Sequence, residues 1–371
     1  MSILAGKSIL TCDYPGMKKP NLQAAAREER LGRSRISKYR TLVQGSFLLL
    51  VLFLGFRFWQ FVRHYESGGS SPYVPHSPGV EAFLPIGGLT SLKYWIGTGE
   101  VHPLHPAALF LFLAAITVSV VLKKSFCGWI CPVGFVSEWI YRPWKKIFGK
   151  NVQLPRWLDY PLRSLKYLVL GFFIWAVLYD MSVPAAAEFL NGDYWKVSDV
   201  KMLKFFTDIS KTALIVTSVI ALLSIPIRNV WCRFLCPYGA LLGLAGLLSP
   251  GAITRDEDSC THCRKCTRNC PAYLPVEASR RVLSPECTSC LTCVSGCPVG
   301  ALSFATPKRL PARFVISGRA GWPGWIFAVL IPVLFFGIVG LAKITGNWQS
   351  RISDDDLKRL VPQVGDLGHP R

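Results

Sequence analysis

The sequence predicts an α-helical integral membrane protein with about five transmembrane helices, into which a small α+β module rich in cysteine is inserted. Three observations predict this fold class. The 371 residues are 51% hydrophobic, with a mean hydropathy of +0.33, which is too apolar for an ordinary soluble chain of this length. The apolar residues gather in runs long enough to cross a bilayer. Eight of the thirteen cysteines lie within residues 260–297.

Five apolar runs come close to the ~20 residues that a bilayer core requires. The second run is short, which indicates a tilted or short helix. The further apolar stretch 83–96 contains proline and glycine, so it is predicted as an interfacial or re-entrant segment. No small-residue cleavage site follows the first run, which is therefore predicted as an uncleaved signal anchor. The five predicted spans cover about residues 42–62, 106–122, 164–181, 211–227 and 322–343.

Lysine and arginine are unevenly distributed between these runs. They are frequent in residues 1–41, 123–163 and 228–319, and rare in residues 63–105. Because loops rich in lysine and arginine stay in the cytoplasm, the first three segments are predicted to be cytoplasmic and the fourth to lie outside. Five spans then put the tail 346–371 outside. The predicted location is the bacterial inner membrane.

The same distribution excludes one class of function. A net charge of +20 and a pI near 9.6 are typical of nucleic-acid-binding proteins. Here, however, the excess flanks apolar spans, so membrane lipid with anionic headgroups is the predicted partner and nucleic acid is not. Steering of an acidic electron carrier is a second interpretation of the charge.

Two cysteine runs carry the most specific pattern in the chain. Residues 260–271 and 287–298 both read C-x2-C-x2-C-x3-C-P, the pattern of bacterial ferredoxins that hold two 4Fe-4S clusters. In that pattern the fourth cysteine of each run ligates the other cluster. A structural zinc site and a disulfide framework are weaker alternatives, because the doubled third and fourth cysteines suit neither. The predicted ligands are Cys260, Cys263, Cys266 and Cys297 for cluster 1, and Cys287, Cys290, Cys293 and Cys270 for cluster 2.

Four more cysteines lie in two matching phrases, FCGWICPVG and WCRFLCPYG, each of which follows a predicted span. The repetition indicates a duplicated two-span unit. If the local backbone is helical, the cysteines of each pair share one face. A third iron–sulfur cluster, a Cu(I) or other soft-metal site, a thiol redox pair and a structural anchor all remain open. These cysteines are Cys127, Cys131, Cys232 and Cys236; the last cysteine, Cys12, is predicted to be a bystander in the basic tail.

From about residue 42 to residue 304 the chain resembles the membrane-bound polyferredoxins typified by NapH, NosR and CcoG. The resemblance rests on paired C-x3-C-P phrases after membrane spans, followed by two ferredoxin runs. It implies an electron conduit of a bacterial inner membrane, with the eight ferredoxin cysteines as cluster ligands. No flavin-attachment motif precedes the first span, and the predicted fifth span and outer tail fit none of the three subfamilies neatly. NapH-like quinol dehydrogenase subunits are the nearest.

A quinol donor would need groups that accept protons near the edge of the lipid. Glu100, His102 and His105 cluster before the second predicted span, and histidine titrates in the required range. The competing interpretation is an ordinary polar helix entrance. Glu138 is interpreted as a surface residue of a helix. No haem c motif and no nucleotide-binding motif is present.

Together these features predict five segments: a basic tail (1–41), a membrane domain with four spans (42–250), a cytoplasmic module with two 4Fe-4S clusters (251–310), a fifth helix (322–345) and an outer tail (346–371). The predicted function is an electron-transfer subunit, part of an oxidoreductase complex, that links the quinone pool to a cytochrome or iron–sulfur partner. Catalytic residues are not identified. A copper reductase or assembly factor and a membrane redox sensor are the alternatives.

Overall fold

The computed structural model of the protein describes residues 22–148, 152, 154–306 and 321–367. Half of the predicted basic tail, including Cys12, lies outside the described residues. So do the last four residues of the predicted module and the last four of the predicted outer tail.

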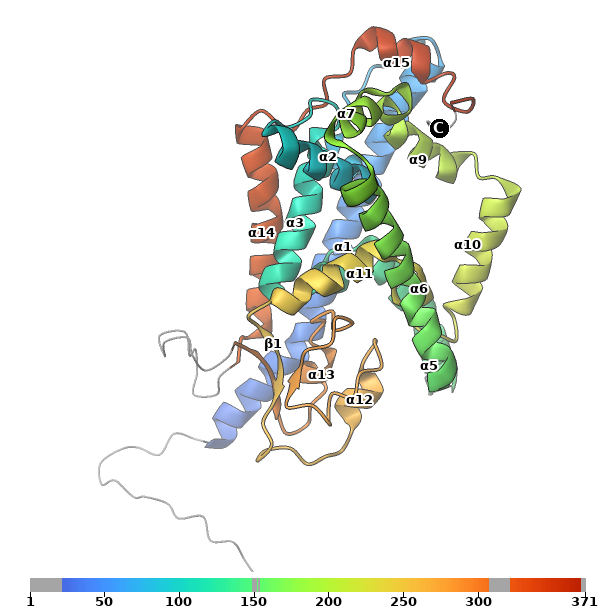
Figure 1. The fold of residues 1–371 in the computed structure, drawn as a ribbon. Helices are drawn as coiled ribbons and strands as arrows, with labels where there is room; N and C mark the ends of the chain where they lie inside the picture. The colour runs from blue at the N-terminus through green and yellow to red at the C-terminus, as the bar shows by residue number, and fades with distance from the viewer. Residues whose placement is uncertain (1–21, 149–151, 153, 307–320, 368–371) are drawn as a thin grey trace, which may run out of the picture.

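Three long helices lie side by side along the molecule: α1 (Leu22–Glu66), α3 (Pro106–Leu122) and α14 (Gly324–Ile344) (Figure 1). Helix α3 is apolar all round, as expected for a helix enclosed by others, and it packs against α14, α2 (Pro85–Thr98) and α11 (Pro237–Ala245). Ala107, Ala114 and Ala115 are completely buried in it. Small side chains at these positions let neighbouring backbones approach closely, which is how helices pack within a membrane.

The number of spans differs from the prediction of five. Among the described residues, three helices are long and apolar enough to cross a membrane: Arg35–Glu66, Trp157–Asp180 and Gly324–Ile344. Helices α9 (Ser198–Thr207) and α10 (Lys211–Leu223) would add a fourth if they are one span, but they are bent by 73°. At 17 residues, α3 is shorter than the ~20 that a bilayer core requires.

The predicted fourth span, 211–227, is longer than the helix that the structure contains. Ser210 begins α10, since its hydroxyl accepts a hydrogen bond from the amide of Ala213. The helix ends at Leu223, three residues before Pro226, and proline disfavours helical backbone at the residue that precedes it. Apolar composition predicted the beginning of this helix at Lys211 but not its end at Leu223.

One end of the long helices is covered by short helices, which together we call the cap (residues 67–105, 182–208 and 346–367). The segment predicted to be re-entrant forms a 14-residue helix here, α2. The residues after the last span are also folded, since Leu360 and Val361 pack against Phe58 and Phe61 of α1. The cap contains η1 (Pro78–Phe83), α2 (Pro85–Thr98), α7 (Val183–Asn191), α8 (Asp193–Lys196), α9 and α15 (Asp354–Leu360).

The cysteine-rich module (residues 251–306) lies at the opposite end of the long helices from the cap (Figure 1). Its three strands form an antiparallel sheet in the order β2-β1-β3, with Ile253 opposite both Val282 and Phe304. The described start of α1 lies at the module end, and the described end of the chain lies in the cap. The module contains β1 (Ala252–Arg255), α12 (Lys265–Asn269), β2 (Arg281–Val282), α13 (Thr292–Ser295) and β3 (Leu302–Ala305).

Candidate functional site

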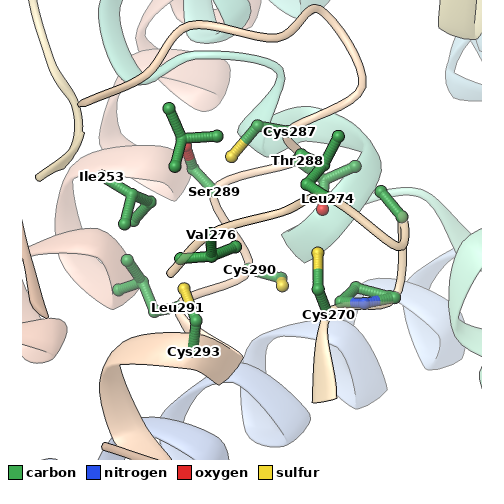
Figure 2. A pocket seen from close by; sticks show the side chains of 13 residues that line it. Ile253, Cys270, Leu274, Val276, Cys287, Thr288, Ser289, Cys290, Leu291 and Cys293 are labelled. Carbon is green, nitrogen blue, oxygen red and sulfur yellow. The ribbon is translucent and has the colours of Figure 1, made fainter. Parts of the chain in front are cut away.

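The structure sorts the eight ferredoxin-type cysteines into two cavities. One cavity is lined by Cys270, Cys287, Cys290 and Cys293 (Figure 2). The other is lined by the remaining four, Cys260, Cys263, Cys266 and Cys297. Each cavity therefore holds three cysteines of one run and the fourth cysteine of the other run, which is the crossed grouping that the sequence predicts.

The two cysteine loops have the same backbone conformation. His262 and Ser289, each two residues after the first cysteine of its run, have positive φ angles of 51° and 43°. Arg264 and Leu291, each four residues after it, have φ angles of 57° and 55°. Alternating left-handed residues turn successive amide groups toward one side, and such concave amide surfaces bind anions, iron–sulfur clusters among them. The backbone of both loops, as well as their cysteines, is therefore suited to binding a 4Fe-4S cluster.

The two cavities differ in their exposure to solvent. Apolar side chains such as Leu274 and Val276 line the cavity of Cys270, and burial raises the pKa of this thiol to about 12. Charged side chains line the other cavity, where the backbone amide of Lys265 lowers the pKa of the exposed Cys263. Buried thiols ionise readily only when a cation binds them. The cysteines in the cavity of Cys270 therefore depend more on bound iron to become thiolates than those in the cavity of Cys263.

The four remaining cysteines, which we call the four-cysteine site, are also brought together. Cys127 lies in α4 (Ser125–Trp129) and Cys232 in the π-helix η3 (Trp231–Leu235). Cys131 and Cys236 lie at the starts of α5 (Pro132–Phe148) and α11 (Pro237–Ala245). Burial raises the pKa of Cys127 to about 12, and the neighbouring Cys131 and Cys236 raise it further; Cys127, Cys131 and Cys236 likewise raise the pKa of Cys232.

The structure explains why glycine follows the second cysteine of each phrase by three residues. The Cys236 sulfur caps α11 and accepts a hydrogen bond from the amide of Gly239 at 3.2 Å. At the start of α5, the amide of Gly134 partly opposes the effect of burial, which raises the pKa of the Cys131 thiol. Each pair of cysteines therefore spans a break between helices, so the helical face that the spacing suggested is not what aligns them. The positive end of a helix dipole favours a thiolate at each of these starts.

No group of three or more histidine, cysteine or acidic side chains converges closely enough for a single metal ion in the part of the chain that the structure describes. This holds for the ferredoxin-type cysteines as well as for the four-cysteine site.

The module contacts the four-cysteine site through the loop that carries Cys287 and Cys290. The indole of Trp129 donates a hydrogen bond to the carbonyl oxygen of Ser289 at 3.0 Å. Gly128 lies so close to this loop that a Cβ atom added to it would be 2.6 Å from the carbonyl oxygen of Thr288. The cavity of Cys270 is therefore the one adjacent to the four-cysteine site.

The Gly128 contact predicts that Gly128→Ala loosens this interface. Backbone has to move to admit the methyl group, at a cost of about 1–3 kcal/mol. Hydrogen exchange of residues 284–294 in the full chain should accelerate. Gly171→Ala, where nothing lies within 4 Å, is the matched control and should leave exchange unchanged. Equal protection in both variants would show that the interface does not depend on this close approach.

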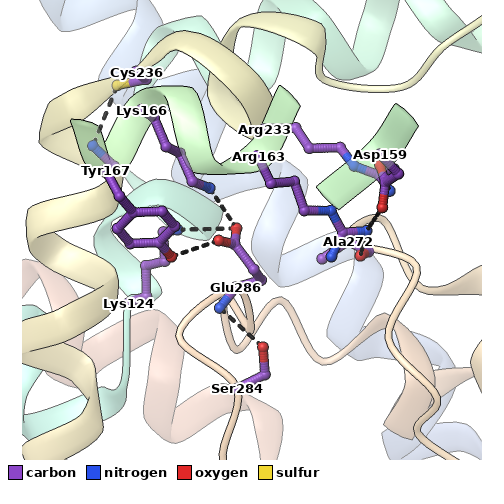
Figure 3. Close-up of polar contacts among 11 residues, drawn as sticks. Lys124, Asp159, Arg163, Lys166, Tyr167, Arg233, Cys236, Ala272, Ser284 and Glu286 are labelled. Atoms are coloured by element: carbon purple, nitrogen blue, oxygen red, sulfur yellow. Dashed lines mark hydrogen bonds and ion pairs between the residues drawn. The ribbon is translucent and has the colours of Figure 1, made fainter. Parts of the chain in front are cut away.

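Polar side chains connect the same region to the membrane helices, and the sequence reasoning missed them. Glu138, interpreted above as a surface residue, is largely buried and forms ion pairs with Arg40 and with Arg228, the latter at 2.5 Å. On α6 (Arg156–Ile174), Asp159 pairs with Arg233, which lies between the two cysteines of the second phrase (Figure 3). In the sequence, the arginine within the second C-x3-C phrase was the only indication of these ion pairs.

The predicted quinol-binding residues do not form the expected group. Glu100 is exposed and its backbone interacts with Thr98, whereas His102 and His105 are buried. Instead, the His105 ring lies 3.1 Å from the carboxylate of Glu81 and is completely buried.

His105 lies in a buried polar cluster of the cap that the sequence did not indicate. His76 pairs with Asp199 at 2.8 Å, and the His76 and His105 rings are 6.3 Å apart. Burial opposes the charged form of His105, but Glu81 and Asp199 raise its pKa to about 9.

Two protein families that bind 4Fe-4S clusters match the segments of this chain that contain the cysteines described above. The 4Fe-4S binding domain family matches residues 104–154 and 211–255, which include the four-cysteine site. The 4Fe-4S dicluster domain family matches residues 252–298. No solved structure matches the chain.

Among curated proteins, the electron transport protein YccM of Escherichia coli is 42% identical over 334 residues, which are 89% of this chain and 92% of YccM. The ferredoxin-type protein NapH of Haemophilus influenzae is 30% identical over 45% of this chain and 55% of NapH. The methylamine utilization ferredoxin-type protein MauN of Methylorubrum extorquens is 30% identical over 44% of this chain and 54% of MauN.

Apolar helices joined to 4Fe-4S binding domains define an iron–sulfur electron-transport protein of a membrane. The likeness to YccM extends over nearly the whole chain, and the likeness to NapH and MauN over less than half of it. The chain belongs to the membrane polyferredoxin family.

Proposed function

We propose that this protein is an inner-membrane electron-transfer subunit that connects the quinone pool with partner redox subunits through three 4Fe-4S clusters. Cluster 1 is held by Cys260, Cys263, Cys266 and Cys297, cluster 2 by Cys287, Cys290, Cys293 and Cys270, and a third by the four-cysteine site. When bound, such clusters accept and release single electrons.

One observation carries the proposal: the loop of the cluster 2 cysteines packs directly on Gly128 and Trp129 of the four-cysteine site. This contact orders the three sites. Cluster 2 is in the middle, the four-cysteine site adjoins the membrane helices, and cluster 1 is the farthest from them. The exposed Cys263 and its neighbours Arg264 and Arg268 then suit an acidic redox partner that docks at cluster 1.

The proposed orientation places the module in the cytoplasm. The basic start of α1 and the module lie at the same end of the long helices, and the cap lies at the other end (Figure 1). This arrangement suits the positive-inside distribution of lysine and arginine. NapH and MauN are ferredoxin-type proteins, which supports exchange of electrons with partner redox proteins.

Iron and acid-labile sulfide in the purified full chain should be close to twelve atoms each, since a 4Fe-4S cluster contributes four of each. Replacing Cys131 and Cys236 together with serine should reduce both to about eight, and leave the electron paramagnetic resonance signals of the two module clusters in place. About eight atoms before and after the change would remove the third cluster from the proposal. Copper at the four-cysteine site would instead favour a metal reductase.

Electron transfer from the membrane is tested by adding a reduced quinone analogue to the oxidised protein in detergent. The visible absorption of the clusters should bleach, and the Cys131/Cys236 double variant should bleach much more slowly. Dithionite should reduce the module clusters of both proteins alike. If quinol fails to bleach the unmodified protein, the quinone pool is not its electron donor.

A further inference from the structure

A buried polar group joins the cluster 2 loop to the four-cysteine site (Figure 3). Glu286, which directly precedes Cys287, lies with its carboxylate 2.6 Å from the Lys166 ammonium and 2.6 Å from the Tyr167 hydroxyl. The Lys124 ammonium is 3.7 Å from the same carboxylate. The side chain of Lys166 is completely buried and that of Lys124 is 4% exposed.

Two ammonium groups share one carboxylate, so the group has a net charge of +1. Both lysines act electrostatically on the Cys127 sulfur of the four-cysteine site. Nearer the start of α6, Arg163 and Arg233 share the carboxylate of Asp159, at 2.6 and 2.5 Å, so that cluster is also positive by one charge. The charge of the two lysines and Glu286 is the one that lies between the two sites.

Keeping this charge buried is costly. Removing an ammonium group from water costs several kcal/mol, and apolar residues of similar volume often replace a buried ion pair without loss of stability. Charged side chains within membrane segments are rare and mark functional positions. Lys166 lies on α6, within the candidate span Trp157–Asp180, so a role other than packing is expected for it.

We propose that Lys166, together with Lys124, raises the reduction potential of the cluster in the four-cysteine site, and that Glu286 moderates this effect. The proposal rests on the third cluster of the proposed function. A cluster becomes more negative by one charge when it is reduced, so a nearby positive charge favours the reduced form. Electron transfer between the two sites oxidises one cluster by one electron and reduces the other by one, with no bond formed or broken.

The competing explanation is that Lys166, Tyr167 and Glu286 only fasten the module to α6. A fastening role and an electrostatic role respond differently to substitution. Loss of any partner weakens a fastening, whereas the potential should change in opposite directions when a positive or a negative charge is removed. The reduction potential therefore separates the two explanations.

The experiment is a redox titration of the full chain in detergent, followed by electron paramagnetic resonance. The signal of the four-cysteine cluster is the one lost in the Cys131/Cys236 double variant. Lys166→Met should lower the equilibrium constant for one-electron reduction of this cluster about tenfold. This corresponds to a reduction potential lower by about 59 mV. Glu286→Gln should raise it, Lys166→Arg should preserve it, and Tyr167→Phe should leave it nearly unchanged while removing one hydrogen bond.

The outcomes distinguish the two proposals. If the four-cysteine cluster is present but Lys166→Met does not lower its potential, the electrostatic proposal is wrong and the third cluster stands. The same holds if Lys166→Met and Glu286→Gln change the potential in the same direction. If Lys166→Met does not fold, Lys124→Gln and Glu286→Gln provide the same pair of opposite changes. Absence of any signal from the four-cysteine site overturns the third cluster, and this proposal with it.

Discussion

Replacing Cys270 with serine is expected to remove cluster 2 while leaving cluster 1 in place, although Cys270 belongs to the same run as three ligands of cluster 1. The cavity that Cys270 shares with Cys287, Cys290 and Cys293 is the physical reason. Iron should fall by about four atoms per chain. Because cluster 2 is the middle site in the proposed order, quinol should no longer reduce cluster 1, and electron transfer to a partner docked there should be lost.

Double variants test the crossed grouping directly. Adding Cys287→Ser to Cys270→Ser should remove no further iron, because both residues hold the same cluster. Adding Cys260→Ser should remove about four more atoms. The matched control is Cys297→Ser, which removes cluster 1 and leaves cluster 2 reducible by quinol. If Cys270→Ser and Cys260→Ser prove non-additive, the ligands follow the two runs and the crossed grouping is wrong.

His105→Gln is expected to destabilise the cap by about 3 kcal/mol, because it leaves the Glu81 carboxylate buried without its charged partner. The pH dependence has a definite sign. The pKa of His105 is raised to about 9, so its stabilising effect is complete below pH 6.5 and is lost as the pH rises through 9. Asp199 also raises this pKa, and it pairs with His76, whose ring lies 6.3 Å from the ring of His105.

Hydrogen exchange of residues 78–108 measures this effect. In the unmodified protein, protection should weaken between pH 6.5 and 9.5, and in His105→Gln it should be low at both. His102→Gln is the control, since burial lowers the pKa of His102 and its ring is neutral over this range. Protection that is independent of pH in the unmodified chain would mean that the His105 pair is not charged.

The sequence predicted best what depends on local spacing. The two cysteine runs determine their own backbone, and the four residues with positive φ occupy equivalent places in both loops. The grouping of the cysteines in two cavities matches the ferredoxin pattern, in which the fourth cysteine of each run ligates the other cluster. The C-P-x-G phrases were recognised as a repeat, but the bond from the Gly239 amide to the Cys236 sulfur is visible only in the structure.

Contacts between segments that are distant in the sequence could not be predicted from it. Glu81 and His105 come from different elements of the cap, and Glu286 and Lys166 are 120 residues apart. A lysine in an apolar helix and a glutamate before a cysteine are unremarkable until the fold joins them. Hydropathy predicted three of the five spans, which overlap Arg35–Glu66, Trp157–Asp180 and Gly324–Ile344. It did not predict where α10 ends, because hydropathy measures composition and the residues around Pro226 determine that end.

The four-cysteine site is assembled from two separate halves, one of which ends at the start of α5 and the other at the start of α11. Neither half offers more than two sulfur atoms, and α6, the cap helices α7, α8 and α9, and α10 lie between them along the chain. Iron delivered during synthesis would therefore meet an incomplete binding site until the ribosome has passed residue 236. Loading of the complete site would then follow the synthesis of α6 and α10, which lie between its two halves.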